Sequence, residues 1–415
     1  GEVTGNTVNL GDGKGTMPTG YAINGTIFGG KNTTDPNKVS NNTLNVNTNA
    51  KAYNIENFST INFNFSTHTD TNHALLELTD TNGTKLNSLS QLYVKNAKVG
   101  RGTLIWNSNG IDVTDSTKVG RTEETTETII EKNSNNKAIN YRTYQFKGST
   151  TTDFEGSNIW GGRSTLGNTT TGNKVTVSGN YSGKYAYGGW TTGTGSTATG
   201  ADAKNHSIGN KITLEGSNSE VYHMTGGFTD VAGGKATGNT VTVEKNLTAN
   251  IIGGKAAAEA SDNTVNLSNA TVNAVIGGEG ATTNNNTVNL NGGANVTGAL
   301  KGGSAANGTG NTLNVKGKDN KAGSISGFQK MNFDATDAST DAAMLRTTGA
   351  TDVNWETLTV KNAVASEKPL TLLENANGIN ISGRTGDAVK SELNTDATME
   401  TNIDVVKSGD KVTAL

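Results

Sequence analysis

The sequence predicts an all-β protein, a right-handed parallel β-helix with about 23–25 residues per coil and with loop or hairpin insertions. Three observations predict this solenoid: a short aliphatic motif that recurs along the chain, glycine pairs between its copies, and a polar composition. Of the 415 residues, 54 are Gly and 3 are Pro, 32% are hydrophobic, and the formal net charge is −3. Disorder normally comes with more proline and a larger net charge. The composition therefore favours a folded chain of short strands and turns around a thin core.

The recurring motif is a pentapeptide that starts with Asn, continues with Thr or Lys, and holds two aliphatic residues separated by Asn or Thr. The two aliphatic side chains lie two positions apart, so they point to the same face of a strand. Eight copies occur, beginning at Asn6, Asn42, Asn173, Asn210, Asn239, Asn263, Asn286 and Asn311. The last four begin 24, 23 and 25 residues apart, which sets the length of one coil. Because stacked coils align the asparagines, we expect their amides to form a hydrogen-bonded ladder.

Glycine pairs follow an apolar or aromatic residue between copies of the pentapeptide. These preceding residues are Phe28, Trp160, Tyr187, Ile252 and Ile276 in the tight form, and Met224 and Leu300 in a looser form. Paired glycines permit a sharp turn or a close backbone approach, so each repeat is expected to contain two strands and a glycine turn. A leucine-rich repeat would need a regular leucine pattern, and a propeller blade would need a longer repeat. A parallel β-helix of about 17 coils therefore fits the length of the chain.

A longer duplication accompanies the short repeat. Residues 55–63 (IENFSTINF) match residues 325–333 (ISGFQKMNF). A similar strand follows each copy, at 92–97 (LYVKNA) and at 358–363 (LTVKNA). Between the copies, at about 112–150, the repeat lapses into a charged, Thr-rich stretch.

This lapse sets the predicted domain organisation. We expect a first β-helix module over 1–111 and an irregular linker or protruding hairpin over 112–150. A second, longer module is expected over 151–415, continuing the same rod. No apolar run is long enough to cross a bilayer, and the N-terminus lacks a signal-peptide core. We therefore expect the chain to start after any export signal and to stop before any membrane anchor.

Residue types that carry catalysis or bind metals are sparse. With no cysteine, the chain has no disulfide and no thiolate ligand or nucleophile. None of the histidines lies beside a Gly-x-Ser-x-Gly motif, and no calcium-binding glycine-rich nonapeptide occurs. The acidic clusters are Asp334, Asp337 and Asp341, and Glu123, Glu124 and Glu127. We interpret these acids as solvated loop residues. We predict no catalytic residue, no metal and no cofactor, and a pI near 5.9 without a basic run argues against nucleic acid as a partner.

The distribution of aromatic residues indicates a ligand. The candidate binding residues are Tyr185, Tyr187, Trp190, Tyr222 and His223. They lie in or next to one of the longest intervals between repeats, and aromatic side chains above a rigid scaffold commonly bind sugars or proteins. The alternative is that Tyr185 and Tyr187 fill the core, because they precede a glycine pair where another coil has two isoleucines. Trp190, which follows the glycine pair, is expected to be exposed.

The Gly-Asn-Thr-Val-Asn-Leu repeats with Ile-Gly-Gly turns resemble the passenger domains of type V (autotransporter) secreted adhesins of anaerobic Gram-negative bacteria, fusobacterial or Veillonella-like. The resemblance covers nearly the whole chain except about 112–150. It implies a secreted chain at the cell surface, anchored at the outer membrane in the full-length protein by a translocator barrel that this chain does not contain. It also implies an adhesive role, with a place in virulence or biofilm formation.

These observations predict a non-enzymatic adhesin that binds host glycans, host proteins or other bacteria. One alternative is a polysaccharide-degrading enzyme, since a fold alone does not fix activity. Another is a stalk or a self-associating segment, in which the exposed strand edges of neighbouring molecules pair.

Overall fold

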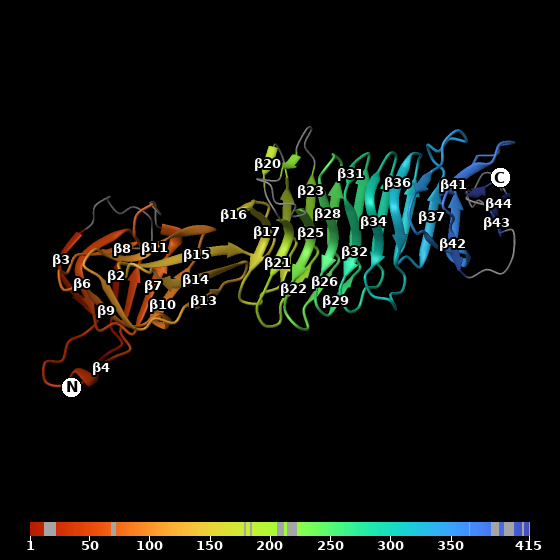
Figure 1. The fold of residues 1–415 in the computed structure, drawn as a ribbon. Coiled ribbons are helices and arrows are strands. Elements are labelled where there is room, and N and C mark those ends of the chain that lie inside the picture. The colour runs from red at the N-terminus through yellow and green to blue at the C-terminus, as the bar shows by residue number, and fades with distance from the viewer. Residues whose placement is uncertain are drawn as a thin grey trace. The chain divides into compact units, whose positions relative to one another are not determined.

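The computed structural model describes residues 1–11, 22–67, 72–177, 180–182, 185–205, 211–213, 222–364, 366–382, 390–393, 402–408 and 411–414. For residues 180–182, 211–213, 222, 390–393 and 402–408, only the backbone is described. The chain is all-β, with stacked parallel strands that form a β-solenoid of about 12 turns (Figure 1). The prediction of a parallel β-helix is confirmed. Two compact units make up the chain, Gly1–Gln145 and Phe146–Leu415.

The first unit is built around three sheets. One holds β2 (Thr7–Leu10), β5 (Thr43–Val46), β7 (Thr60–Asn64) and β10 (Leu92–Lys95). Another holds β3 (Ala22–Phe28), β6 (Ala50–Glu56), β8 (Leu76–Leu78), β11 (Gly100–Asn107), β15 (Ala138–Gln145), β14 (Thr126–Lys132) and β13 (Val119–Thr122). The third pairs β9 (Thr84–Ser88) with β12 (Ile111–Asp115). The remaining elements are β1 (Val3–Thr4), β4 (Val39–Ser40), and the 3₁₀ turns η1 (Pro36–Lys38), η2 (Phe65–Thr67) and η3 (Leu89–Gln91). Inward-pointing aliphatic and aromatic residues of these sheets form one core, which includes Leu44, Phe63 and Leu92.

The sequence leaves open a linker or a protruding hairpin over 112–150. In the structure, strands β13, β14 and β15, within 119–145, extend a sheet of the first unit. Strands β14 and β15 pair antiparallel from Thr126↔Gln145 to Lys132↔Ile139. Strand β15 also pairs antiparallel with β11, which carries the sheet on from the parallel coils. The solenoid has fewer turns than the 17 expected, because such strands and longer coils take up residues. The coil from Tyr185 to its register partner His223, for example, is 38 residues long.

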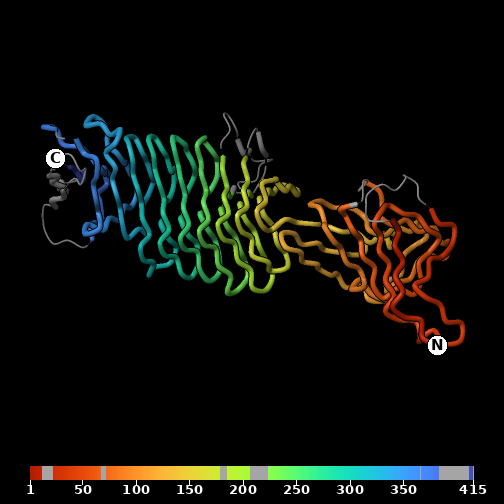
Figure 2. The backbone as a smooth tube through the Cα atoms, turned by 180° about the vertical axis from the view of Figure 1, so that it is seen from behind, coloured from red at the N-terminus to blue at the C-terminus, as the bar shows by residue number. Residues whose placement is uncertain are grey.

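The second unit has three solenoid faces. The long face holds β17 (Asn158–Ser164), β21 (Tyr185–Thr191), β25 (Tyr222–Thr229), β28 (Ala249–Lys255), β32 (Ala274–Glu279), β34 (Asn295–Gly303), β36 (Asn320–Ser326), β38 (Leu345–Thr347) and β41 (Leu370–Glu374). The next face holds β19 (Lys174–Thr176), β23 (Asp202–Asn205), β27 (Thr240–Val243), β30 (Thr264–Ser268), β33 (Thr287–Asn291), β35 (Thr312–Lys316), β37 (Lys330–Asp334) and β40 (Leu358–Lys361). The shortest face holds β18 (Thr170–Thr171), β22 (Thr197–Thr199), β26 (Lys235–Thr237) and β29 (Glu259–Ser261). Figure 2 shows the successive coils of this unit running side by side.

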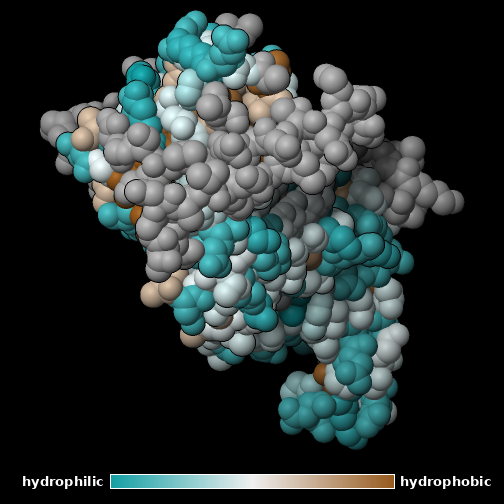
Figure 3. Space-filling model, turned by 90° about the vertical axis from the view of Figure 1, so that its right-hand side faces the viewer, coloured by the Kyte–Doolittle hydropathy of each residue, from teal (hydrophilic) through white to brown (hydrophobic). Residues whose placement is uncertain are grey.

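Shorter elements complete the second unit. At its ends, the long sheet is extended by antiparallel strands, namely β16 (Asp153–Glu155), β45 (Lys411–Ala414), β44 (Asn402–Ser408) and β43 (Lys390–Leu393). The others are β20 (Asn180–Ser182), β24 (Lys211–Thr213), β31 (Thr271–Val272), β39 (Asp352–Asn354), η4 (Trp355–Thr357) and β42 (Asn380–Ser382). Among the described helical turns, none is long and apolar enough to cross a membrane. On the face shown in Figure 3, hydrophilic side chains predominate among the coloured residues.

Asparagines of the pentapeptide form the expected ladder. Asn239, Asn263, Asn286 and Asn311 are each fully buried. The Nδ2 of each of the first three donates to the Oδ1 of the next, at 3.0, 3.1 and 3.0 Å. The glycine pairs leave room for this ladder, because a Cβ on Gly254 would lie 2.4 Å from Asn263 Nδ2. A second row of asparagines on the outer face of the sheet is hydrogen-bonded in the opposite direction, because each Nδ2 donates to the Oδ1 of the preceding coil. This row holds Asn266, Asn289, Asn314 and Asn332.

One expected repeat does not enter the stack. The copy at Asn210 was expected to supply a coil strand, but its strand β24 pairs with β20 instead. Strand β23 takes the place between β19 and β27, with Ala203 in register with Val175 and Val241. Gly200, just before β23, has φ +63°, close to the +66° of Gly238 before β27. The backbone turn that starts a coil strand is therefore present before β23, and its small Ala203 fits the core. Asn210 itself lies outside the described residues.

Candidate functional site

Strands β17, β21 and β25 lie next to one another at the start of the second unit and carry a cluster of aromatic side chains. Their register aligns Asn158, Tyr185 and His223 in one row. The next outward row holds Trp160, Tyr187 and Thr225, and the row beyond the glycine pairs holds Arg163, Trp190 and Phe228. Between the first two rows, Ile159, Ala186 and Met224 belong to the core cluster. Because side chains alternate along a strand, the two flanking rows lie on the outer face of the sheet.

The rings on this outer face contact each other from coil to coil. Tyr185 stacks on His223 with ring centroids 5.4 Å apart and planes at 4°. Trp190 and Phe228 also lie with parallel planes, at 6.5 Å and 4°. Tyr187 lies 6.0 Å from Tyr185 and 5.4 Å from Phe228, and Trp160 meets Trp190 edge-on at 6.1 Å. We call this cluster of Trp160, Tyr185, Tyr187, Trp190, His223 and Phe228 the aromatic face.

The structure brings together four of the five binding residues expected from the sequence. Tyr185, Tyr187, Trp190 and His223 belong to the aromatic face, whereas Tyr222 begins β25 and its side chain lies outside the described part of the chain. Trp190, for which exposure was expected, is half-buried, as are Tyr185 and His223, and Tyr187 is buried. Ala186, between the two tyrosines, belongs to the core cluster, and the tyrosines stack on the opposite face of the sheet. Tyr187 is nonetheless a buried packing residue there.

Arginine 163 lies at the edge of the aromatic face and is neutralised by two acids. Its guanidinium lies 3.9 Å from the Trp160 ring centroid and 5.7 Å from that of Trp190. Its Nη1 lies 2.6 Å from Glu155 Oε2 and 3.8 Å from Asp153 Oδ2, both on β16. Planar guanidinium groups stack on indole rings in this way, so the buried Arg163 side chain packs against Trp160. In the described part of the chain, the buried Trp160 Nε1 has no hydrogen-bond partner.

Two groups of the aromatic face have shifted pKa values. Burial, followed by the nearby Tyr185 and Asp230, raises the pKa of the Tyr187 phenol. Burial, followed by the charge of Lys255, lowers the pKa of His223. Both shifts favour the neutral form, so the aromatic face is uncharged near neutral pH apart from Arg163 and its paired acids. Such a surface can contact the apolar face of a ligand and exchange hydrogen bonds through the tyrosine hydroxyls and the imidazole.

The candidate set from the sequence lacks two residues of the aromatic face, Trp160 and Phe228, and also Arg163 at its edge. The signal for them was the glycine pair. Trp160 precedes its pair as Tyr187 does, and Arg163 and Phe228 follow theirs as Trp190 does. Aligning the coils on the glycine pairs, in place of the pentapeptides, brings these residues into rows.

The acidic clusters of the sequence make separate structural contacts. The interpretation as solvated loop residues is wrong for Glu127, which is fully buried on β14. Asp334 accepts hydrogen bonds from Thr336 and Asn362, and Asp341 pairs with Lys368 at 2.8 Å. Glu123 accepts hydrogen bonds from the backbone N–H groups of Asn96 and Ala97. Within the described ranges, no group of three or more His, Cys, Asp or Glu side chains is placed to hold a metal ion.

Comparison with known proteins gave no match to a protein-family model, to a curated protein or to a solved structure.

Proposed function

We propose that this chain is a non-enzymatic, cell-surface adhesin of the autotransporter passenger class, and that it binds glycans of host or bacterial cells through the aromatic face. The observation that carries this proposal is the pair of parallel rings formed by Trp190 and Phe228 on adjacent strands. Sugar rings present C–H groups on one face and hydroxyls at their edges. A row of half-buried flat rings beside tyrosine hydroxyls suits both.

Rigidity of the scaffold supports this proposal. The aromatic side chains stand on three hydrogen-bonded strands in register, so little conformational entropy is lost when a ligand binds. The rings also buttress each other from coil to coil, which holds the half-buried ones at a fixed orientation. Affinity then comes from a modest number of preorganised contacts.

The repeat architecture supports a place at the cell surface. Coils 239–315 are regular and closed by the asparagine ladder, which suits a spacer between a cell and its ligand. The chain has no cysteine, so folding of the solenoid does not depend on an oxidising compartment. Host proteins and other bacteria are further partners for the same face, through the glycans or aromatic-binding surfaces that they carry.

The test is binding of the full 415-residue chain to a broad glycan array, with mucin and extracellular-matrix proteins beside it. We expect saturable binding to one glycan class, and loss of that binding in Trp190→Ala and Phe228→Ala. Tyr93→Ala is the matched control, because Tyr93 is a 41% exposed aromatic residue of the first unit, outside the aromatic face. No binding across the array, or unchanged binding by both aromatic-face variants, would contradict the proposal.

A further inference from the structure

The duplication seen in the sequence extends over a pair of coils, and each unit contains one copy. Beyond the matching stretches 55–63 and 325–333, residues 107–111 (NSNGI) match residues 375–379 (NANGI). The contacts match as well. Asn107 Nδ2 donates to Thr84 Oγ1 at 3.0 Å, and Asn375 Nδ2 donates to Thr351 Oγ1 at 3.2 Å. Thr84 is therefore the counterpart of Thr351. The second unit thus holds a second copy of the same coil pair, with which the first copy can be compared.

The two copies differ in the loop that leads to this threonine. In the second unit the loop is Thr348–Ala350, and it closes onto the coil before it: Ile325 N donates to Ala350 O at 2.9 Å, and Ile325 bridges to Thr351. In the first unit the loop is Thr79–Gly83, two residues longer. Here the N–H of Ile55, the counterpart of Ile325, donates to the Asn54 side chain at 2.9 Å. The side chain replaces the backbone contact that closes the wall in the second unit.

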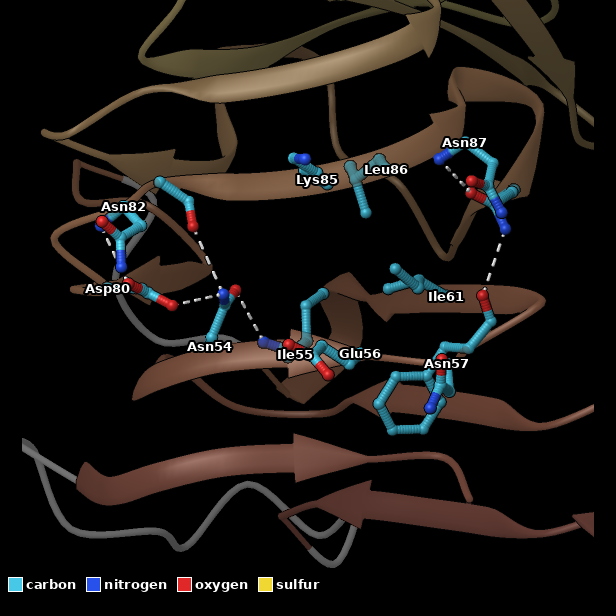
Figure 4. Close-up of a pocket in the computed structure, with 13 residues that line it drawn as sticks. Asn54, Ile55, Glu56, Asn57, Ile61, Asp80, Asn82, Lys85, Leu86 and Asn87 are labelled. Carbon is cyan, nitrogen blue, oxygen red and sulfur yellow. Dashed lines mark hydrogen bonds between the residues drawn. The ribbon is translucent and has the colours of Figure 1, made fainter. Parts of the chain in front are cut away.

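A pocket of about 450 Å³ opens at this place in the first unit. Among the described strands, β9 on one side of the pocket pairs with β12 alone. On the other side of the pocket, β3 is the only one of these strands with which Asn54–Glu56 pair. The volume lies in the range of roughly 300–1,000 Å³ that small-molecule pockets occupy. Figure 4 shows polar groups at both ends of the pocket and the apolar Leu86, Ile61 and Ile55 between them.

The first end of the pocket is organised around a buried amide and a carboxylate. Asn54 is 5% exposed, and its Nδ2 donates to Asp80 Oδ2 at 2.8 Å. Its Oδ1 also accepts from Thr84 Oγ1 at 2.9 Å, so the amide is held on several sides. The backbone N–H of Asn82, and then the Asn54 amide, hold the pKa of Asp80 below its usual value. Asp80 is therefore a fixed, ionised hydrogen-bond acceptor that is only half-buried.

The other end and the floor have different chemistry. Gln91, in the turn η3 that precedes β10, donates to Phe58 O at 3.1 Å and so links this turn to the preceding coil. Asn87 lies at the rim of the pocket. The floor is formed by the buried side chains of Ile55, Phe58, Ile61 and Leu86. Three charged residues line the pocket. Glu56 and Lys85 lie at the rim and have opposite charges, and Asp80 is the third. This combination of an apolar floor, amides and a single extra carboxylate favours a neutral ligand with several hydroxyls.

We propose that this pocket binds one neutral pyranose unit, with its C–H face on the apolar floor and its hydroxyls hydrogen-bonded to Asp80 and the flanking amides. The pocket lies in the first unit and the aromatic face in the second, so this inference does not depend on the aromatic face. Loss of one site leaves the other to be tested. The two-residue extension of the loop is the feature that opens the pocket, and the second unit shows the closed form.

The experiment measures binding of monosaccharides to the full chain by saturation-transfer NMR and calorimetry. The neutral probes are galactose, glucose, N-acetylglucosamine and N-acetylgalactosamine, and glucuronate is the charged probe. We expect at least one neutral probe to saturate a single site. Asp80→Ala should weaken its affinity about tenfold or more, as expected for lost hydrogen bonds to a charged group. Replacing Thr79–Gly83 with Thr-Gly-Ala, the sequence of residues 348–350, should close the pocket and remove binding.

Two controls make the outcome decisive. Asp352→Ala alters an exposed acid on β39, the counterpart of β9, and Trp190→Ala alters the aromatic face; both should bind the neutral probe as the unaltered chain does. If the loop replacement does not fold, Asp80→Ala still decides the matter. The proposal is overturned if no neutral probe binds, if glucuronate alone binds, or if Asp80→Ala binds like the unaltered chain. Binding that Trp190→Ala removes and Asp80→Ala does not would place the sugar on the aromatic face instead.

Discussion

Asn263 and Asn286 are joined by two hydrogen bonds to one oxygen: Asn286 Oδ1 accepts from both the backbone N–H and the Nδ2 of Asn263, each at 3.1 Å. The same double contact joins Asn239 to Asn263 and Asn286 to Asn311, at 3.0 Å. Each asparagine also donates from Nδ2 to a backbone carbonyl of its neighbouring coil, as Asn286 does to Ala260 at 2.9 Å. The ladder thus satisfies buried backbone N–H groups that no strand partner reaches.

Asn286→Ala should destabilise the second unit by about 2 kcal/mol or more, because it leaves two buried donors of Asn263 without an acceptor. Asn289→Ala is the matched control, since Asn289 belongs to the half-buried outer row and water can replace its partners. The measurement is the midpoint of urea unfolding for the full chain. Equal shifts of the midpoint for the two variants would show that the buried ladder contributes no more to stability than the outer row does.

Asn205→Val should stabilise the second unit by about 1–3 kcal/mol. Asn205 is fully buried in register with Val243, and within the described residues neither atom of its amide has a hydrogen-bond partner. The same change at Asn173 should destabilise the unit, because the Asn173 amide bonds Ser149 N and Phe146 O at 2.9 Å. Thermal unfolding of the two variants checks the opposite signs. A lower midpoint for Asn205→Val would mean that its amide has a partner in solution.

Acidification should weaken the second unit through His223. Burial and Lys255 lower the pKa of His223 in the folded protein from its usual 6.5. As pH falls below 6.5, the unfolded chain takes up a proton that the folded chain does not, so stability falls until the lowered pKa is reached. His223→Phe keeps a ring for Tyr185 to stack on and should remove this part of the dependence. Unfolding midpoints measured from about pH 7.5 to about pH 5 test it, and identical slopes for both proteins would refute it.

The sequence was sufficient to predict the solenoid, because its signal is local and repeated. Two aliphatic residues two positions apart, a positive-φ residue before Asn and a glycine pair recur in coil after coil. The ladder from Asn239 to Asn311 follows directly from the equal spacing of these asparagines. Of the aromatic face, the sequence predicted Tyr185, Tyr187, Trp190 and His223 as one cluster.

The rest depends on contacts that a single sequence pattern does not encode. The pentapeptide at Asn210 and the segment Asp202–Asn205 compete for one place in the stack, and Asp202–Asn205, which matches the motif less well, occupies it. Trp160 and Phe228 join the aromatic face through register across strands, which the pentapeptide alignment does not show. The pocket of the first unit arises from a two-residue difference in loop length, and its effect becomes visible only when both copies of the coil pair are compared.

The asparagine ladder has a direction. Each Oδ1 of the ladder from Asn263 to Asn311 accepts from the backbone N–H and the Nδ2 of the asparagine one coil nearer the N-terminus. The last acceptor is Gln329 Oε1, 2.9 Å from Asn311 N. The two ends of any run of coils are therefore chemically different. At a cut on the C-terminal side, a fragment exposes the asparagine backbone N–H and one Nδ2 hydrogen that bonded the missing Oδ1. At a cut on the N-terminal side, it exposes an Oδ1 acceptor together with the Nδ2 hydrogen that bonded the missing carbonyl. A C-terminal cut end is therefore complementary to an N-terminal cut end, whereas two cut ends of the same kind are not complementary.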